Sequence, residues 1–289
     1  MQAGGRAWYR RSVRVCVLSS GSGGNSLWVE AGRTCLLVDA GLALKETARR
    51  CAEVGLDVRD LTAVLLTHEH ADHCHAAGIF ARKLGVPVHS TRGTMQALRD
   101  PPPEELRFAV RSGVPVQLGA LRVIPVALPH DACEPVAYVF EEEQPQGVVR
   151  AALVTDLGSA PPSVVRALQG LDALVLEMNH DLRMLLEGPY PWRLKQRIRS
   201  AVGHLSNAQG AELLAQVLHG GLRHLTLAHL SEHNNTPAKA RRAAEAVLAK
   251  FGSRAQLTVG DQAGPLAPIS LEPGLQPPLR RPRQLALFA

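Results

Sequence analysis

A short run of three histidines and one aspartate constrains what this chain can fold into more than any other feature. Ala63–Thr67 has the apolar composition of a buried strand, and it leads directly into His68 and His70. Because one residue separates these two histidines, both imidazoles point to the same side of the chain. Asp72 and His73 follow in the first turn of a predicted helix and face the same place. Imidazole nitrogen and carboxylate oxygen are ligands that zinc, manganese and iron accept, so we predict a metal site here rather than a histidine-rich solvent loop.

Strand-like and helix-like patterns alternate along the rest of the chain. Runs rich in β-branched and apolar residues predict further strands at Val13–Leu18, Ser26–Val29, Thr34–Val38, Leu121–Val126, Val136–Phe140, Val149–Val154, Ala173–Leu176, His224–Ala228 and Gln256–Val259. Apolar residues at helical spacing predict helices at Leu44–Val54, Ser163–Gln169, Asn207–Leu218 and Pro237–Phe251. Two strand-rich halves with helices between them favour an α/β fold, an αββα sandwich of two sheets packed face to face.

The length of 289 residues suits one large domain with short extensions. We place a basic extension at 1–12, the folded domain at 13–261, and a flexible proline-rich tail at 262–289. No apolar run reaches the roughly 20 residues of a membrane span, and no signal-peptide pattern is present, so we expect a cytoplasmic protein without membrane contact. The five cysteines include no C-x-x-C pair, which argues against a disulfide framework and a thiolate zinc site.

The net charge of +6 favours polyanionic partners without requiring them. Tyr190–Arg199 predicts a helix with an apolar stripe and a basic face, which includes Arg193, Lys195 and Arg197. Such a face would bind phosphates, and Trp192 would stack on a base. The alternative is a solvated helix with a core tryptophan.

A glycine-rich turn, Gly21–Asn25, joins the first two predicted strands. Backbone N–H groups in such a turn can bind an anion, so Ser22, Gly23 and Asn25 are candidate phosphate contacts. An ordinary hairpin turn fits the same residues equally well.

The H-x-H-x-D-H pattern of residues 68–73 resembles the signature of the metallo-β-lactamase superfamily. The resemblance extends to three later residues that each follow a predicted strand, namely His130, Asp156 and His229. It implies two divalent metal ions, Zn²⁺ or Mn²⁺, each held by three residues. His68, His70 and His130 would hold one ion, and Asp72, His73 and His229 would hold the other. Asp156 would lie between the two ions. Such a pair of ions can hydrolyse a phosphodiester, a thioester or a lactam, so the ligands give the reaction type and leave the substrate open.

Longer segments resemble one branch of this superfamily, the YycJ or WalJ branch, whose members are described as 5′-to-3′ exonucleases on double-stranded DNA. The matching segments are Leu18–Ser26, Val38–Gly41, Glu177–Asp181, Gly188–Ile198, Gly203–Asn207 and Ser231–Asn235. One position departs from the branch pattern, because His233 stands where a glutamate is expected. The resemblance implies that this chain is a nuclease.

His204 stands at the entrance of a predicted helix, because a serine–asparagine pair suited to an N-cap follows it. By resemblance, His204 protonates the leaving oxygen of a phosphodiester and Glu177 orients it, with a purely structural histidine as the alternative. The resemblance also implies a catalytic role for Asp72, in addition to its role as a metal ligand. His180 and Asn179 would contact the metal ligands without binding the metal themselves, and a ligand role for His180 stays open.

The last residues form an apolar peptide at the end of the proline-rich tail. Gln284–Phe288 resembles the peptide by which bacterial replication and repair proteins bind the DNA polymerase sliding clamp. The resemblance implies that Gln284, Leu285, Leu287 and Phe288 contact a clamp pocket. The alternative is that these residues fold back on their own domain.

Together these features predict a dinuclear metal-dependent phosphodiesterase, specifically a 5′-to-3′ exonuclease acting on double-stranded DNA ends. A phosphodiesterase of small or cyclic nucleotides, or an RNase, would use the same ligands. A lactonase, a thioesterase and a non-catalytic clamp-binding scaffold are the remaining alternatives.

Overall fold

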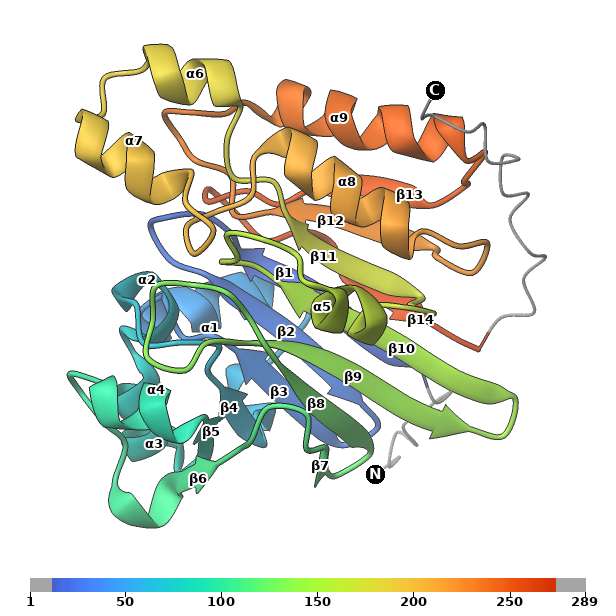
Figure 1. The fold of residues 1–289 in the computed structure, drawn as a ribbon. Helices are drawn as coiled ribbons and strands as arrows, with labels where there is room; N and C mark the ends of the chain where they lie inside the picture. Colours follow the sequence, from blue (N-terminus) through green and yellow to red (C-terminus); the bar gives the residue numbers. More distant parts are fainter. Residues whose placement is uncertain (1–11, 274–289) are drawn as a thin grey trace.

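The computed structural model describes residues 12–273, and their strands form two seven-stranded sheets that lie face to face (Figure 1). The first sheet has the order β14-β1-β2-β3-β4-β5-β6, with β1 Val13–Ser19, β2 Ser26–Ala31, β3 Thr34–Val38, β4 Ala63–Leu65, β5 Val88–Ser90, β6 Arg107–Ala109 and β14 Ile269–Leu271. The second has the order β13-β12-β11-β10-β9-β8-β7, with β7 Val116–Leu118, β8 Leu121–Ala127, β9 Val136–Gln144, β10 Gly147–Val154, β11 Ala173–Glu177, β12 His224–Ala228 and β13 Gln256–Val259.

Helices cover the outer face of each sheet. The helices of the described residues are α1 Leu44–Glu53, α2 Ala71–Cys74, α3 Ala77–Leu84, α4 Arg92–Ala97, α5 Pro162–Ala167, α6 Leu182–Glu187, α7 Trp192–Ile198, α8 Asn207–Val217 and α9 Pro237–Lys250, of which α6 and α7 lie off the sheet faces (Figure 1). One apolar cluster, which includes Val38 and Tyr138, fills the space between the sheets. A second joins the first sheet to α1 and α3, and a third joins the second sheet to α5, α8 and α9. The predicted αββα sandwich is therefore confirmed.

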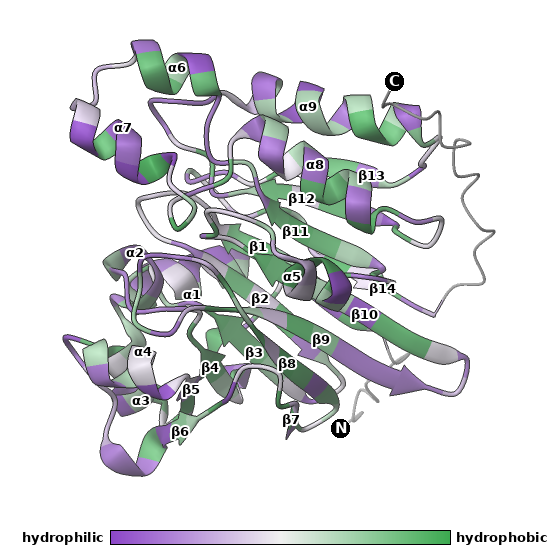
Figure 2. Cartoon of the chain, in the orientation of Figure 1, coloured by the Kyte–Doolittle hydropathy of each residue, from purple (hydrophilic) through white to green (hydrophobic). Residues whose placement is uncertain are grey.

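The composition of the strands follows from these layers. β3 and β11 are buried at every residue, because the opposite sheet covers one face and helices cover the other. Figure 2 shows both strands in the green of apolar residues. β8, nearer the edge of its sheet, has exposed Arg122 and Ala127 between buried neighbours. No helix within residues 12–273 is long and apolar enough to cross a membrane.

The predicted strands and helices are all present, with ends that differ by a few residues. The elements that the sequence did not predict are α3, α4, α6, β5, β6, β7, β14 and two short 3-10 helices at Val58–Asp60 and Glu104–Leu106. Each of these four strands has only three residues, so the sequence offers too few positions for an alternating pattern to be recognised.

The predicted start of the tail at residue 262 is too early. β14 pairs with β1, with Leu271 opposite Val13. Gln262 also belongs to the domain, because its side chain donates to Ser19 Oγ at 2.7 Å and accepts from Gly23 N at 2.9 Å. The folded domain thus continues to β14, whereas the predicted clamp peptide, residues 284–288, lies outside the described residues.

Candidate metal centre

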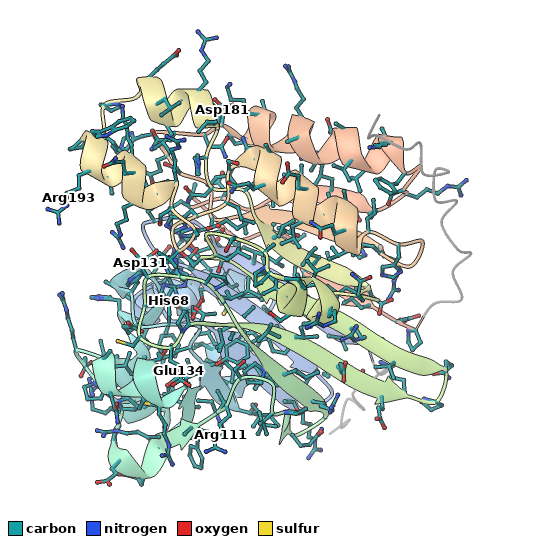
Figure 3. All side chains as sticks on the ribbon, viewed as in Figure 1. His68, Arg111, Asp131, Glu134, Asp181 and Arg193 are labelled. Atoms are coloured by element: carbon teal, nitrogen blue, oxygen red, sulfur yellow. The ribbon has the colours of Figure 1, made fainter. Side chains whose placement is uncertain are left out.

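The predicted ligand segment lies at the end of β4, in the first sheet (Figure 3, His68). The ring centroids of His68 and His70 are 4.5 Å apart, and those of His68 and His73 are 4.2 Å apart. Asp72 and His73 lie in α2, which begins directly after His70. His68 and His73 are buried. The structure therefore brings the four motif residues together, as predicted.

Three loops of the second sheet reach the same place. His130, Asp156 and His229 follow β8, β10 and β12, which run in the same direction and end at the same edge of the sheet. Asp156 and His229 have left-handed backbone conformations, with φ of 60° and 54°. Non-glycine residues adopt this conformation at a cost, and such strain concentrates at functional sites.

The candidate ligand atoms form overlapping groups. Within each group the atoms lie within 4.8 Å of one another, and three of the groups are His68, His70 and His130; Asp72, His73 and His229; and His68, His73 and Asp156. The first two are the two triads that the sequence implied. Asp156 lies next to both triads, because it shares a group with His68 of the first, and its carboxylate oxygens are 3.2 Å from His73 Nε2 and 3.5 Å from His229 Nε2 of the second.

The surroundings of His73 indicate that the centre suits a cation. Its Nδ1 lies 2.7 Å from Asp39 Oδ2, and its Nε2 faces Asp72 Oδ2 at 3.3 Å and Asp156 Oδ2 at 3.2 Å. Burial opposes protonation of His73, but Asp156, Asp39 and Asp72 outweigh it and raise the pKa of His73 well above its usual range, so these atoms require a positive charge between them, either a proton or a metal ion. His68 Nε2 and Asp156 Oδ2 are buried without a hydrogen-bond partner among residues 12–273. These donors fit divalent metal ions.

The pKa shifts agree with this interpretation. Burial, reinforced by His73, lowers the pKa of His68 well below its usual range and keeps the imidazole in its neutral, ligand form. Burial also opposes protonation of His229, but Asp156 and the other carboxylates outweigh it and raise the pKa of His229 to about 10. The carboxylates of the centre therefore attract a positive charge, whether a proton or a metal ion.

Asp39 is a functional residue that sequence reasoning missed. It follows β3, is buried, and has a left-handed backbone with φ of 63°. Besides His73, its carboxylate accepts from Thr67 N at 2.8 Å and from Thr67 Oγ1 at 2.9 Å. Asp39 thereby fixes the ring orientation of His73. An aspartate directly after a strand rich in apolar residues was the available signal, and the sequence alone assigned it no role.

Glu177 plays the corresponding part in the second sheet. It ends β11, is fully buried, and its Oε1 lies 2.9 Å from His204 Nδ1 and 3.1 Å from His229 Nδ1. Its Oε2 accepts from Leu205 N at 2.9 Å. Although burial would raise the pKa of Glu177, the two histidines, His204 foremost, lower it below its usual range. The predicted contact between Glu177 and His204 is therefore present, and Glu177 also orients His229.

Asn179 and His180 lie close by in different ways. Asn179 Nδ2 donates to the carbonyl oxygen of His229 at 3.0 Å, so it supports that loop as predicted. His180 is buried and belongs to none of the ligand groups found in residues 12–273. Burial lowers the pKa of His180 to about 4, which keeps it neutral.

The glycine-rich turn fits the alternative of an ordinary hairpin turn better than that of an anion-binding loop. Four of its five backbone N–H groups donate within the protein: Gly21 to Asn25 Oδ1, Gly23 to Gln262 Oε1, Gly24 to the carbonyl oxygen of Gly21, and Asn25 to that of Asp72. The N–H of Gly23 is therefore not available to a phosphate.

Two residues of this turn lie at or beside the centre. Asn25 Nδ2 is 3.0 Å from His73 Nε2 and 3.3 Å from Asp72 Oδ2. Ser22 lines a pocket that also includes His204 and His229. The turn thus contributes the Asn25 side chain to the centre and Ser22 to the pocket beside it.

The basic helix, α7, is only partly what the sequence predicted. Trp192 is 58% exposed, which excludes the alternative of a core tryptophan. Arg193 extends away from the molecule (Figure 3), whereas Arg197 pairs with Asp131 beside the metal centre. The prediction for Lys195 is wrong, because this side chain is buried and donates to carbonyl groups at the end of α6.

Lys195 Nζ donates to the carbonyl oxygens of Leu186 and Gly188, each at 2.7 Å. The carbonyl groups at a helix C-terminus lack partners within the helix, and a lysine can satisfy them. Lys195 therefore fastens α7 to α6 and does not face solvent.

The positive net charge is not a property of the folded domain. Residues 1–11 and 274–289 contain six of the 32 basic residues and none of the 26 acidic residues, so residues 12–273 have 26 of each sign. A basic domain surface is therefore not an argument for a nucleic-acid partner.

Comparisons with known proteins agree with this geometry. The family model for the "Beta-lactamase superfamily domain" matches residues 34–247. Exodeoxyribonuclease YycJ of Bacillus anthracis is 38% identical over 243 residues, which cover 83% of this chain and 90% of that protein. Exodeoxyribonuclease WalJ of Streptococcus pneumoniae is 36% identical over 227 residues, 77% of this chain and 83% of that protein.

A solved structure supports the fold. The metallo-β-lactamase-fold protein YhfI of Bacillus subtilis superposes with a TM-score of 0.66 at 18% identity, over 88% of this chain and 99% of that one. This fold implies the use of divalent metal, in agreement with the donor set described above. The chain therefore belongs to the β-lactamase superfamily and, within it, to the family of the exodeoxyribonucleases YycJ and WalJ.

Proposed function

We propose that this protein is a metal-dependent nuclease, an exonuclease that degrades double-stranded DNA from the 5′ end. The observation that carries the proposal is 38% identity to an exodeoxyribonuclease over 83% of the chain. The convergence of two ligand triads beside His204 supports it, because phosphodiester hydrolysis needs both a metal site and a proton donor. DNA as substrate would place the enzyme in the cytoplasm.

Two divalent ions, Zn²⁺ or Mn²⁺, are the proposed cofactors. His68, His70 and His130 would hold one, and Asp72, His73 and His229 would hold the other, with Asp156 shared. When bound, such ions activate water and neutralise charge on the phosphate. Asp39 and Glu177 would keep the ligand imidazoles in the correct orientation by accepting from their Nδ1 atoms.

His204 is the proposed general acid. Its Nδ1 is held by Glu177, so Nε2 is the atom that would donate a proton to the leaving oxygen. The ring centroid of His204 lies 5.3 Å from that of His130 and 5.2 Å from that of His229, which places it beside both triads. Asn25 Nδ2, which lies against Asp72 and His73, would donate to a phosphate oxygen.

The test is hydrolysis of four substrates by the purified protein with Mn²⁺ or Zn²⁺: end-labelled duplex DNA, single-stranded DNA, RNA and bis-p-nitrophenyl phosphate. The proposal expects successive mononucleotides from duplex DNA, and the variant Asp156→Ala as an inactive control. Preferential cleavage of RNA, or of the small diester with no DNA cleavage, would replace it with an RNase or a small-molecule phosphodiesterase.

The clamp peptide stays a proposal of its own. Gln284, Leu285, Leu287 and Phe288 would bind a sliding clamp, and such a tether would raise the local concentration of the enzyme on DNA. Deletion of residues 284–289 is expected to abolish clamp binding in calorimetry and to leave hydrolysis of bis-p-nitrophenyl phosphate unchanged. A full-length protein that binds no clamp contradicts the proposal.

A further inference from the structure

A pocket of about 190 Å³ opens beside the metal centre, on the side of His204 and His229. Part of its lining, here called the α7 wall, is largely apolar and comes from α7 and the loop before it, and another part carries hydroxyl and amide groups. The first part consists of Tyr190, Leu194 and Ile198, and the second of Ser22, Asn179 and Ser231. An apolar surface together with polar groups matches a nucleotide, which combines a flat base with a sugar that carries oxygen atoms.

A single guanidinium completes the pocket. Arg197 lines it and donates through Nε to Asp131, which also lines it and follows the candidate ligand His130. No residue within 12–273 accepts a hydrogen bond from the two terminal nitrogens of Arg197. A guanidinium held by one edge and open at the other is suited to a bidentate contact with a phosphate.

We propose that this pocket binds the 5′-terminal nucleotide of a DNA strand, with its base on the α7 wall and its 5′-phosphate on Arg197. The proposal rests on the nuclease function proposed above. A nucleotide beside the proton donor His204 is the leaving group. A 3′-terminal nucleotide would bring no phosphate at its far end, whereas a 5′-terminal nucleotide brings a phosphomonoester, for which Arg197 is the matching cation.

The chemistry of the step balances. Water adds its hydroxyl to phosphorus, the bond between phosphorus and the 3′-oxygen of the terminal nucleotide breaks, and that oxygen takes a proton from His204. The remaining proton of the water returns to solvent, from which His204 is reprotonated. The shortened strand now ends in a new 5′-phosphate. Each cycle therefore creates the group that Arg197 recognises in the next one.

The test compares two arginines of the same helix, Arg197→Gln and Arg193→Gln, because Arg193 extends away from the molecule (Figure 3). kcat/KM is measured on duplexes with a 5′-phosphate and with a 5′-hydroxyl. Wild type is expected to prefer the 5′-phosphate by roughly 10- to 100-fold, the scale of a charge-assisted bidentate contact. Arg197→Gln should reduce this preference to near unity, Arg197→Lys should restore part of it, and Arg193→Gln should retain it.

The outcomes separate this inference from the nuclease proposal. A wild type that degrades DNA but ignores the terminal phosphate overturns the pocket assignment and leaves the nuclease function standing. Equal loss of preference in Arg197→Gln and Arg193→Gln also overturns it, because the effect would then be general charge. A wild type that cuts no DNA with either metal overturns both proposals. Thermal melting of each variant checks that the fold is intact.

Discussion

The two halves of the metal centre are built in opposite ways. The first sheet supplies four candidate ligands from one segment, residues 68–73, whereas the second supplies three from three separate loops. Each half also has one buried carboxylate behind its histidines. Asp39 holds only His73, but Glu177 holds both His204 and His229. The first half of the metal centre therefore forms from residues close together in the sequence. The second half depends on the correct register of the sheet and on one carboxylate, that of Glu177, shared by two histidines.

Asp156 joins the two halves, so its removal should have the largest effect. Its oxygens face His73 of the first half and His229 of the second. Asp156→Ala is expected to lose at least one metal ion per chain and to reduce turnover by roughly 10³-fold or more. Elemental analysis and DNA hydrolysis measure both effects, with Asp100→Ala on the exposed surface as the matched control. If Asp156→Ala keeps its full metal content and wild-type turnover, Asp156 does not link the two halves of the metal centre.

Glu177→Gln and Asp39→Asn compare the two supporting carboxylates directly. An amide has one acceptor oxygen and would present N–H groups to a backbone or histidine donor, so Glu177→Gln disturbs two histidines and should lower turnover by roughly 10²- to 10³-fold. Asp39→Asn disturbs one histidine and should cost about 10- to 100-fold in metal affinity. Asparagine tolerates the left-handed backbone of residue 39, so the loss reports the changed side chain and not backbone strain.

Metal titrations of both variants provide the measurement. Excess metal should restore activity to Asp39→Asn but not to Glu177→Gln, because His204 is not one of the proposed ligands. Recovery of both variants would mean that Glu177 acts only through His229.

His204→Ala is expected to leave the metal content unchanged and to slow DNA hydrolysis by roughly 10²-fold, the usual contribution of a general acid. The loss should shrink for bis-p-nitrophenyl phosphate, since p-nitrophenolate leaves without protonation. This difference between substrates is what a structural histidine would not produce. Equal losses on both substrates therefore remove His204 from the acid role.

The same contrast explains what the sequence could and could not predict. The ligands of the first half are consecutive, and those of the second each follow a recognisable strand, so spacing and resemblance together located His130, Asp156 and His229. Glu177 lies far from His204 along the chain, and its second contact, with His229, depends on β11 and β12 being neighbours. Asp39 lies 34 residues from His73, the histidine that it orients, which is why its role was missed.

Lys195 was mispredicted for a different reason. A helical pattern shows which residues share a face but not whether another helix end will occupy that face. The carbonyl groups at the end of α6 need donors, and Lys195 is the residue that reaches them. The short strands β5, β6 and β7 were missed because pairing within the sheet, and not their own sequence, makes them strands.

The smallest expected effect concerns a buried histidine that has no carboxylate partner. His89 ends up beside Phe108, with ring centroids 5.1 Å apart, and burial lowers its pKa to about 4, whereas carboxylates raise that of His229 to about 10. Because the unfolded chain binds a proton at His89 near pH 6.5 and the folded chain does not, His89 contributes stability above that pH, and the contribution is lost as the pH falls toward 4. The loss should be on the order of 2 kcal/mol in the free energy of unfolding.

Urea unfolding of wild type and His89→Gln is compared between pH 7 and pH 4, a range that spans the unfolded and folded pKa values of His89. The free energy of unfolding should depend less on pH in the variant, and DNA hydrolysis at pH 7 should be unchanged. If the variant loses stability with pH as steeply as wild type, the acid sensitivity belongs to the histidines of the metal centre, and the distinction between partnered and unpartnered histidines does not hold.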